Sequence, residues 1–267
     1  MLNCISAPHP HLNAQLHDNG ILELVLNRPQ RKNAFFGEFY MALAQALAEA
    51  DQSDAVRVLL LRGEQDFSAG NDLQDFIDHP PQNTDAPAFV VLRAAATFSK
   101  PLVIAIKGVA IGIGSTLLLH ADLVYTDSNA RFQLPFLTLG LVPEGASTLL
   151  LPQRAGYLKA AELLLLGEPF DAQTALAAGL VNQIIASDDE NDDVYAHALA
   201  KAARLTRLPA ISLKLSKQLL RGNIEAVLEQ INAEGRHFIE RAQSPALHEA
   251  VAAFKEKRQP DFRQFDV

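Results

Sequence analysis

The hydrophobic positions of this chain follow two alternating patterns. Short runs rich in Val, Ile and Leu predict buried strands at residues 21–26, 56–61, 102–106 and 123–125. Between them, apolar residues recur at helical spacing and predict helices over residues 36–50 and 86–98. Strands that alternate with helices in this way indicate an α/β fold.

The pattern changes after residue 146, where glycines interrupt a series of apolar helical stretches. One strand-like run remains at residues 181–185. The acidic run 187–193 follows it, and we interpret this run as a solvated loop. From residue 194 to 257 the pattern predicts helices throughout, with breaks near Pro209, Gly222 and Pro245. We therefore predict a core over residues 1–193 and a C-terminal helical region over residues 194–267, which packs on a neighbouring copy.

The composition is that of a globular protein, because 49% of the 267 residues are hydrophobic and 20% are charged. The 31 acidic and 23 basic residues give a net charge of −8, which argues against broad non-specific binding to nucleic acid or anionic membranes. A polyanionic ligand must therefore bind at a local basic cluster. Cys4 is the only cysteine, which excludes an internal disulfide or a cysteine-based zinc site and fits a reducing compartment.

No targeting or membrane-spanning segment is evident in the sequence. The start, MLNCISAPHPHLNAQ, lacks the apolar run of a secretory signal and the Arg-rich pattern of a transit peptide. The longest apolar stretch, residues 102–119, approaches the length of a membrane span, but Lys107 and several glycines interrupt it. A buried strand, a turn and a buried helix fit it better. We predict a cytoplasmic protein with no membrane partner.

Two small-residue turns follow predicted strands. Residues 108–115, GVAIGIGS, lack the endings of P-loop and dinucleotide-binding motifs. They open an apolar helix, whose first N–H groups can hold a negative oxygen, although a tight turn that needs glycine only for packing explains the same residues. The second turn, residues 66–73, is DFSAGNDL, in which Asp72 is placed to cap a following helix. Two such turns can converge on one oxygen.

Motifs along nearly the whole chain share a common pattern. In order, they are NRPQRKNAF, FSAGNDL, KPLVIAIKGVAIGIGSTLLLHADLVY, FQLPFLTLGLVPEGAS and AAGLVNQI. Together, over residues 15–262, they resemble the crotonase (enoyl-CoA hydratase/isomerase) superfamily. The resemblance implies a spiral of β-β-α turns and a C-terminal helical region that assembles trimers, often as a dimer of trimers. It also implies an acyl-CoA thioester substrate, with no metal and no cofactor other than the CoA of the substrate.

The resemblance assigns roles to individual residues. The backbone N–H groups of Ala69 and Ile113 correspond to the family's oxyanion donors. Lys32 is expected near the nucleotide end of the ligand, and Lys255, Lys257 and Arg258 are expected to supply the local basic cluster. The residues implied in substrate binding are Lys32, Ala69, Gly70, Asn71, Asp72, Leu73, Gly112, Phe136, Lys255 and Lys257.

The placement of carboxylates indicates which reaction of the family to expect. Hydratases of this family hold the attacking water between two glutamates, and Thr116 and Phe136 occupy those positions here. Neither side chain ionises near neutral pH, so neither can activate water or complete its addition. Glu144, in LVPEG, matches the catalytic glutamate of the peroxisomal-type Δ3,Δ2-enoyl-CoA isomerases. A single base can move a proton from C2 to C4 of a 3-enoyl thioester, so the sequence predicts an enoyl-CoA isomerase with Glu144 as its base.

Other interpretations stay open. Glu144 can be a structural residue before a helix, and His120 is a second candidate base, although a structural histidine is commoner at the end of an apolar helix. A hydratase or thioesterase with a rearranged base is an alternative function. A catalytically silent acyl-CoA-binding trimer is another.

The acyl pocket has several candidate lining residues. Phe76, Phe136 and Leu139 can line it, but their spacing is equally typical of core residues. Residues 80–87, PPQNTDAP, are expected to form a loop at its edge.

Overall fold

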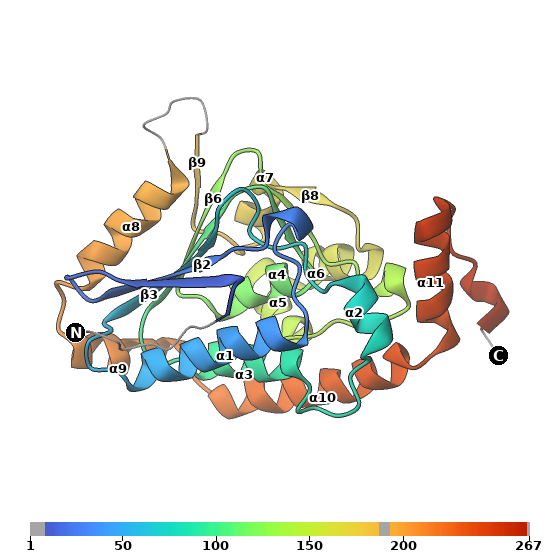
Figure 1. Ribbon diagram of the computed structural model, residues 1–267, viewed down its shortest axis with the longest axis horizontal. Helices are drawn as coiled ribbons and strands as arrows, with labels where there is room; N and C mark the ends of the chain where they lie inside the picture. Colours follow the sequence, from blue (N-terminus) through green and yellow to red (C-terminus); the bar gives the residue numbers. More distant parts are fainter. Residues whose placement is uncertain (1–8, 187–192, 266–267) are drawn as a thin grey trace.

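A six-stranded sheet runs through the centre of the molecule (Figure 1). The structure is a computed structural model that describes residues 9–186 and 193–265. Strand β1 is antiparallel to β2, and the later neighbours are parallel. In spatial order, the strands are β1 (Leu12–Leu16), β2 (Ile21–Leu26), β3 (Val58–Gly63), β4 (Leu102–Ile106), β6 (Leu123–Asp127) and β9 (Gln183–Ile185).

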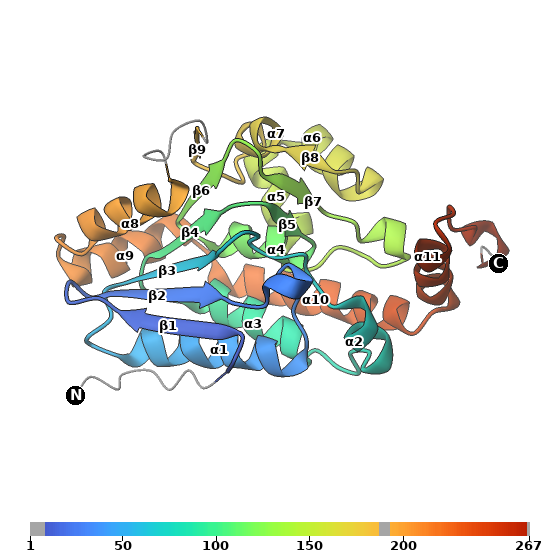
Figure 2. The same ribbon diagram turned by 45° about the horizontal axis from the view of Figure 1, so that its top comes forward.

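Helices cover both faces of this sheet (Figure 2). The larger helices are α1 (Gly37–Gln52), α3 (Pro87–Thr97), α8 (Val194–Leu205), α9 (Ala210–Arg221), α10 (Ile224–Ala242) and α11 (Pro245–Glu256). Leu22 and Leu59 point into the larger core with α1 and α3, whereas Ile21 and Val58, one residue earlier, contact α8 on the opposite face. The strands therefore need apolar residues at nearly every position, as in sheets buried on both sides.

A smaller sheet lies beside the first and carries part of the site. Its strands are β5 (Val109–Ile111), β7 (Arg131–Gln133) and β8 (Phe170–Asp171). Strand β5 follows β4 almost directly through Gly108, which has a φ of 62°. A Cβ atom at Gly108 would lie 2.3 Å from Oδ1 of Asp66, so only glycine fits between β4 and the turn after β3.

Short helices connect these elements. They are η1 (Pro29–Arg31), α2 (Leu73–Asp78), α4 (Ile113–Thr116), η2 (Leu117–His120), η3 (Leu137–Leu139), α5 (Ser147–Ala155), α6 (Tyr157–Ala161), η4 (Glu162–Leu166), α7 (Ala172–Ala177) and η5 (Phe262–Phe265).

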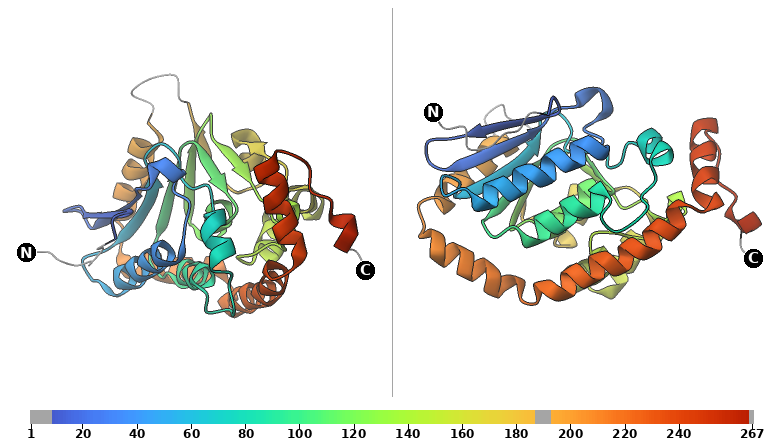
Figure 3. Two further views of the ribbon diagram at one scale, coloured as in Figure 1. Left: turned by 45° about the vertical axis from the view of Figure 1, so that its right-hand side comes forward. Right: turned by 60° about the horizontal axis from the view of Figure 1, so that its bottom comes forward.

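The C-terminal helices are extensions of the core. Helix α8 shares a buried cluster with β2, β3 and β4, and α10 packs along α3 (Figure 3). Helix α11 stands at one end of the molecule, where it contacts η3 and η5. The predicted breaks near Pro209, Gly222 and Pro245 are confirmed as the points where these helices end or begin.

Of the acidic run, residues 187–192 lie outside the described residues, and Asp193 caps α8 and pairs with Lys107.

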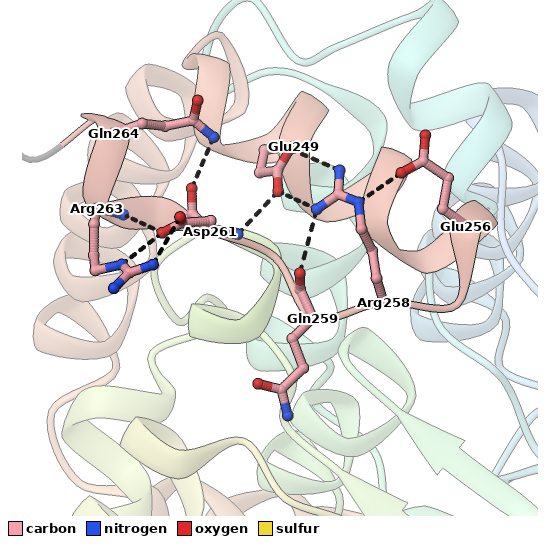
Figure 4. Close-up of polar contacts among 7 residues, drawn as sticks. All are labelled: Glu249, Glu256, Arg258, Gln259, Asp261, Arg263 and Gln264. Carbon is pink, nitrogen blue, oxygen red and sulfur yellow. Dashed lines mark hydrogen bonds and ion pairs between the residues drawn. The ribbon is translucent and has the colours of Figure 1, made fainter.

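Arg258 does not supply free positive charge, contrary to the sequence-based prediction. Its guanidinium binds both carboxylate oxygens of Glu249, at 2.5 and 3.1 Å, and Glu256 at 2.5 Å (Figure 4). Asp261 and Arg263 form a second ion pair in the same segment. Local carboxylates therefore neutralise Arg258, which removes it from the predicted basic cluster.

None of the helices in the described part of the chain is long and apolar enough to cross a membrane.

Candidate active site

Two backbone turns meet where β3 and β5 end. The N–H of Ser68 donates to the carbonyl of Val109, and the N–H of Ile111 donates to the carbonyl of Ser68, each at 2.9 Å. These bonds hold the turn after β3 against the strand that leads into α4. The two turns therefore lie directly against each other, and their convergence on one oxygen stays a prediction.

Glycine is required where the two turns touch. Gly70 has a φ of 84°, and a Cβ atom there would lie 2.6 Å from the carbonyl oxygen of Ile111. A Cβ atom on Gly114 would lie 2.8 Å from the carbonyl oxygen of Ser68. Both distances are shorter than real Cβ contacts, so side chains at either position would separate the two backbones.

The N–H of Ala69 is not free, which differs from its predicted role as an oxyanion donor. It donates to the carbonyl of Lys32 at 2.8 Å. By contrast, the N–H groups of Asn71 and Ile113 have no acceptor among residues 9–186 and 193–265. Ile113 is the first residue of α4, where an N–H has no partner inside the helix. Within the described residues, Asn71 and Ile113 therefore each contribute a free N–H donor to the joined turns.

The loop that carries NRPQRKNAF anchors the turn after β3. Lys32 and Asn33 adopt left-handed conformations, with φ of 48° and 55°. The amide of Asn33 donates to the carbonyl of Asp66 at 2.7 Å, and the Ser68 hydroxyl donates to the carbonyl of Asn33 at 2.9 Å. This geometry directs the Lys32 carbonyl at Ala69 and leaves the Asn71 N–H without a partner.

Asp72 has a structural role in the same turn. Its side chain accepts the N–H of Gln74 and caps α2, as the sequence predicts. Its other oxygen pairs with Arg28 at 2.8 Å, and this ion pair and the cap hold the pKa of Asp72 below its usual range against the effect of burial. The carboxylate is therefore already satisfied by the protein.

Glu144 is a buried carboxyl without a polar partner. Its exposed fraction is 1%, and neither carboxylate oxygen has a hydrogen-bond partner in the described part of the chain. Burial raises the pKa of Glu144 to about 8, and the nearby Glu234 carboxyl adds to the rise. Thr116 lies close enough to oppose the rise, but it completes no hydrogen bond with either oxygen. An unpaired carboxyl with a pKa near neutrality is typical of a general acid or base.

His120 anchors the turn that carries Glu144. Its Nε2 lies 2.9 Å from the carbonyl oxygen of Gly145, so this nitrogen carries the proton and donates it. Burial, with the positive charge of Arg221, lowers the pKa of His120 to about 3. The imidazole is therefore neutral and engaged, which favours the structural interpretation of His120 over a role as the base.

Tyr40 binds the turn after β3 and lies near Glu144. Its hydroxyl donates to Oδ1 of Asn71, and the tyrosine is fully buried. Burial raises the pKa of Tyr40 well above its usual value, with Glu144 as the next largest cause. The buried carboxyl therefore lies near the side chain that fixes Asn71.

An apolar cavity of about 690 Å³ extends from Tyr40 and Asn71. This size is typical of a small-molecule site. The segment predicted to edge the acyl pocket does line it, through Pro80–Asn83 and Ala86–Pro87. Phe136 and Leu139 do not line this cavity, and Phe136 is buried in the core instead. The aromatic lining residues are Phe36, Tyr40, Phe76, Phe89 and Phe238.

A second cavity, of about 330 Å³, meets the first at Asn71. It follows the turn along Asn71, Asp72 and Leu73, and Arg31 and Lys255 bring positive charge to it. Lys257 does not line it. Lys32 is exposed at the same loop as Arg31, with its Nζ 3.9 Å from Asp66. Asn71 therefore lies between an apolar cavity and a smaller one with basic residues.

The burial of Glu144 predicts a pH-dependent stability. The ordinary glutamate pKa is 4.5, so between pH 4.5 and about 8 the native state holds a proton that the unfolded chain has lost. Stability must therefore fall as pH rises through this window. We expect Glu144→Gln to become more stable than wild type with rising pH, by up to about 1.4 kcal/mol per pH unit, and the difference to level off above about pH 8. Urea unfolding of both proteins across this range measures it, and a difference that does not change with pH would contradict the burial argument.

Comparison with known proteins assigns the family. The family model for enoyl-CoA hydratase/isomerase matches residues 17–265. The 1,2-epoxyphenylacetyl-CoA isomerase of Escherichia coli K12 is 35% identical over 92% of this chain and 95% of that protein. The 2,3-dehydroadipyl-CoA hydratase of the same organism is 35% identical over 91% and 95%. Enoyl-CoA delta isomerase 2 of Homo sapiens is 34% identical over 81% of this chain, which spans 56% of that protein. Equal similarity thus connects the chain to proteins named for isomerisation and for hydration.

A solved structure gives the same assignment. The crystal structure of an enoyl-CoA hydratase/isomerase from Pseudoalteromonas atlantica T6c has 43% sequence identity and a TM-score of 0.87, and it covers 94% of this chain and 99% of that one. The two sheets, the helical C-terminal region and the family match together identify the crotonase fold. This chain belongs to the enoyl-CoA hydratase/isomerase family.

Proposed function

We propose that the protein is a Δ3-Δ2-enoyl-CoA isomerase in which Glu144 transfers the proton. The observation that carries the proposal is the state of Glu144: it is buried and unpaired, with a pKa of about 8, and it lies near Tyr40, whose hydroxyl binds Asn71. A base of this kind can accept a proton from carbon and release it again near neutral pH.

The free N–H groups suit the other half of the reaction. In the proposed step, the Glu144 carboxylate removes a proton from C2, and the electron pair moves into the thioester to give a dienolate. The N–H groups of Asn71 and Ile113 then donate to its oxygen, where the negative charge develops. The same carboxyl returns the proton to C4, so the double bond moves from C3–C4 to C2–C3 and no atom is gained or lost.

Hydration is less well supported by the residues beside Glu144. Adding water needs one group to take a proton from water and another to deliver a proton to carbon. Thr116 and Phe136, at the positions of the two hydratase glutamates, cannot do either near neutral pH. Tyr40 is close, but its raised pKa and its bond to Asn71 keep it protonated and engaged.

A product assay tests the proposed function directly. Purified protein is given 3-enoyl-CoA and 2-enoyl-CoA in parallel, and products are separated by chromatography. We expect 3-enoyl-CoA to be converted to 2-enoyl-CoA, and little 3-hydroxyacyl-CoA to form from 2-enoyl-CoA. Rapid hydration with slow isomerisation would overturn the proposal, and binding without turnover would favour the silent acyl-CoA-binding alternative.

The CoA part is proposed to occupy the smaller cavity, with Lys255 near its phosphates. Lys255 lines this cavity, whereas Lys257, two residues later, does not. We expect Lys255→Ala to raise the KM about two- to fivefold with little change in kcat, because an exposed ion pair contributes about 0.2–1 kcal/mol. Lys257→Ala is the matched control, and we expect it to stay near wild type. Added salt should weaken substrate binding to wild type more than to Lys255→Ala. Equal effects of the two substitutions would move the CoA site elsewhere.

The chain is proposed to assemble with threefold symmetry. Helices α9 and α6 lie on separate parts of the molecule (Figure 2), and each carries exposed apolar side chains. On α9, Leu219 and Leu220 are 83% and 88% exposed, and on α6 Leu158 is 82% exposed. Two unlike patches fit a ring in which one patch of each subunit contacts the other patch of the next.

Light scattering measures this assembly. We expect a particle mass of three or six times the chain mass of 29.1 kDa. Leu219→Arg combined with Leu220→Arg should reduce it to the monomer, because charge at both positions would be buried in the contact. A wild-type monomer at micromolar concentration would contradict the prediction.

A further inference from the structure

Glu234 is a buried carboxylate that has no part in the proton transfer proposed above. It lies on α10 and is 5% exposed, although it is far from Glu144 in sequence. One carboxylate oxygen accepts the N–H of Ala146 at 2.6 Å. The other accepts the N–H of Thr148 at 2.9 Å and also the Thr148 hydroxyl. These donors belong to the turn directly after Glu144 and to the first turn of α5.

The segment that Glu234 binds is conformationally unusual. Ala146 is the N-cap of α5, and it adopts a left-handed conformation with φ of 56°. This conformation is unfavourable for alanine and persists only where the surroundings hold it. Ala146 has no side-chain oxygen to cap the helix, so the Glu234 carboxylate supplies both the acceptor and the negative charge that a helix start favours.

The turn is thus held from two sides. Glu234 binds it through the N–H of Ala146, and His120 binds the carbonyl of Gly145. We propose, on the basis of the isomerase function proposed above, that Glu234 is a positioning residue for Glu144, which fixes its turn and places a second carboxylate behind it.

The charge of Glu234 raises the pKa of Glu144. Burial raises the pKa of Glu234, while the donors of Thr148 and Ala146 oppose that rise and favour its ionised form. A negative charge there disfavours ionisation of Glu144 and contributes to its raised pKa. The other titratable groups around Glu144 and its turn are Tyr40 from α1, Asp75 from α2 behind Tyr40, His120 from η2, and Arg154 and Arg221 behind His120.

The experiment titrates Glu144 by NMR of isotope-labelled glutamate side chains in the full chain. The Glu144 signal is identified by its loss in Glu144→Gln. We expect Glu234→Gln to move the titration midpoint of Glu144 to lower pH, because a negative neighbour is removed. A glutamine cannot accept both sets of bonds, so we also expect kcat for isomerisation to fall about 10- to 100-fold with little change in KM. Glu240→Gln, an exposed position on the same helix, is the matched control and should change neither value.

Two further variants keep the inference testable if Glu234→Gln folds poorly. Glu234→Asp retains the charge but shortens the side chain, so we expect the midpoint to stay near wild type while kcat falls. Thr148→Val removes the hydroxyl donor and should move the midpoint in the same direction as Glu234→Gln, by less. An unchanged midpoint in both Glu234→Gln and Thr148→Val would overturn the inference. A shifted midpoint in a protein that lacks isomerase activity would refute the proposed function and leave the positioning of Glu144 by Glu234 intact.

Discussion

Glu144→Gln is expected to lower the rate of 3-enoyl-CoA isomerisation by about 10²–10⁴-fold, the usual loss when a positioned general base is removed. The amide has nearly the size of the carboxyl, so the packing around it is retained. The N–H groups of Asn71 and Ile113 are untouched, and we therefore expect acyl-CoA affinity to stay near that of wild type. The initial rate of product formation measures the loss, and binding of a saturated acyl-CoA measures affinity.

The control for this variant is Glu162→Gln. Glu162 is exposed and pairs with Lys159 on the surface, and it lines neither of the two cavities described above. Its loss should therefore leave turnover unchanged. If Glu144→Gln retains near-normal isomerisation, Glu144 is not the base. Because the imidazole of His120 is neutral and bound to Gly145, a rearranged carboxylate would then be the next candidate.

Gly70→Ala is expected to lower kcat/KM by about 10²–10³-fold, which is the typical loss when an oxyanion donor is removed. The added Cβ would lie 2.6 Å from the carbonyl oxygen of Ile111, so the two turns must separate. Asn71 follows Gly70 directly, and its N–H would move away from that of Ile113. The substitution thus disrupts the donor pair without changing either donor residue or Glu144.

The matched control is Gly222→Ala. Gly222 also has a positive φ, 63°, but a Cβ atom there would meet nothing within 4 Å. Both substitutions introduce backbone strain. Only the substitution at Gly70 also introduces a clash, between the added Cβ atom and the carbonyl oxygen of Ile111. Equal losses of activity in the two variants would show that strain alone is responsible, and thermal unfolding of both shows how much of any loss comes from reduced stability.

The sequence predicted the elements whose pattern is long enough to show a period. The parallel strands and the long helices lie close to their predicted positions because they are buried on defined faces. The small sheet was missed, since its strands have only two or three residues. Strand β1 was missed because it is an edge strand in which Leu12 is buried and the following residues are exposed.

The candidate site was predictable only where side-chain identity determines function. Glu144 and the two glycine turns are visible in the sequence. The sequence does not reveal which backbone N–H is free. That depends on the carbonyl of Lys32, which accepts the N–H of Ala69 and leaves the N–H of Asn71 without an acceptor. Glu234 carries no local signal either, since a glutamate in an amphipathic helix resembles any surface residue. The fold alone brings it to the turn after Glu144.

The unpaired burial of Glu144 has a consequence for how variants of this protein would be selected. A carboxyl in this position lowers the stability of the native state at neutral pH, and most replacements that remove its charge also relieve that penalty. With Glu144 as the proposed base, a screen for thermostability alone is expected to enrich proteins that are changed at this position and have lost turnover. Under the same proposal, a screen that also requires turnover is expected to retain the glutamate and gain stability elsewhere, as where stability and activity conflict at one residue.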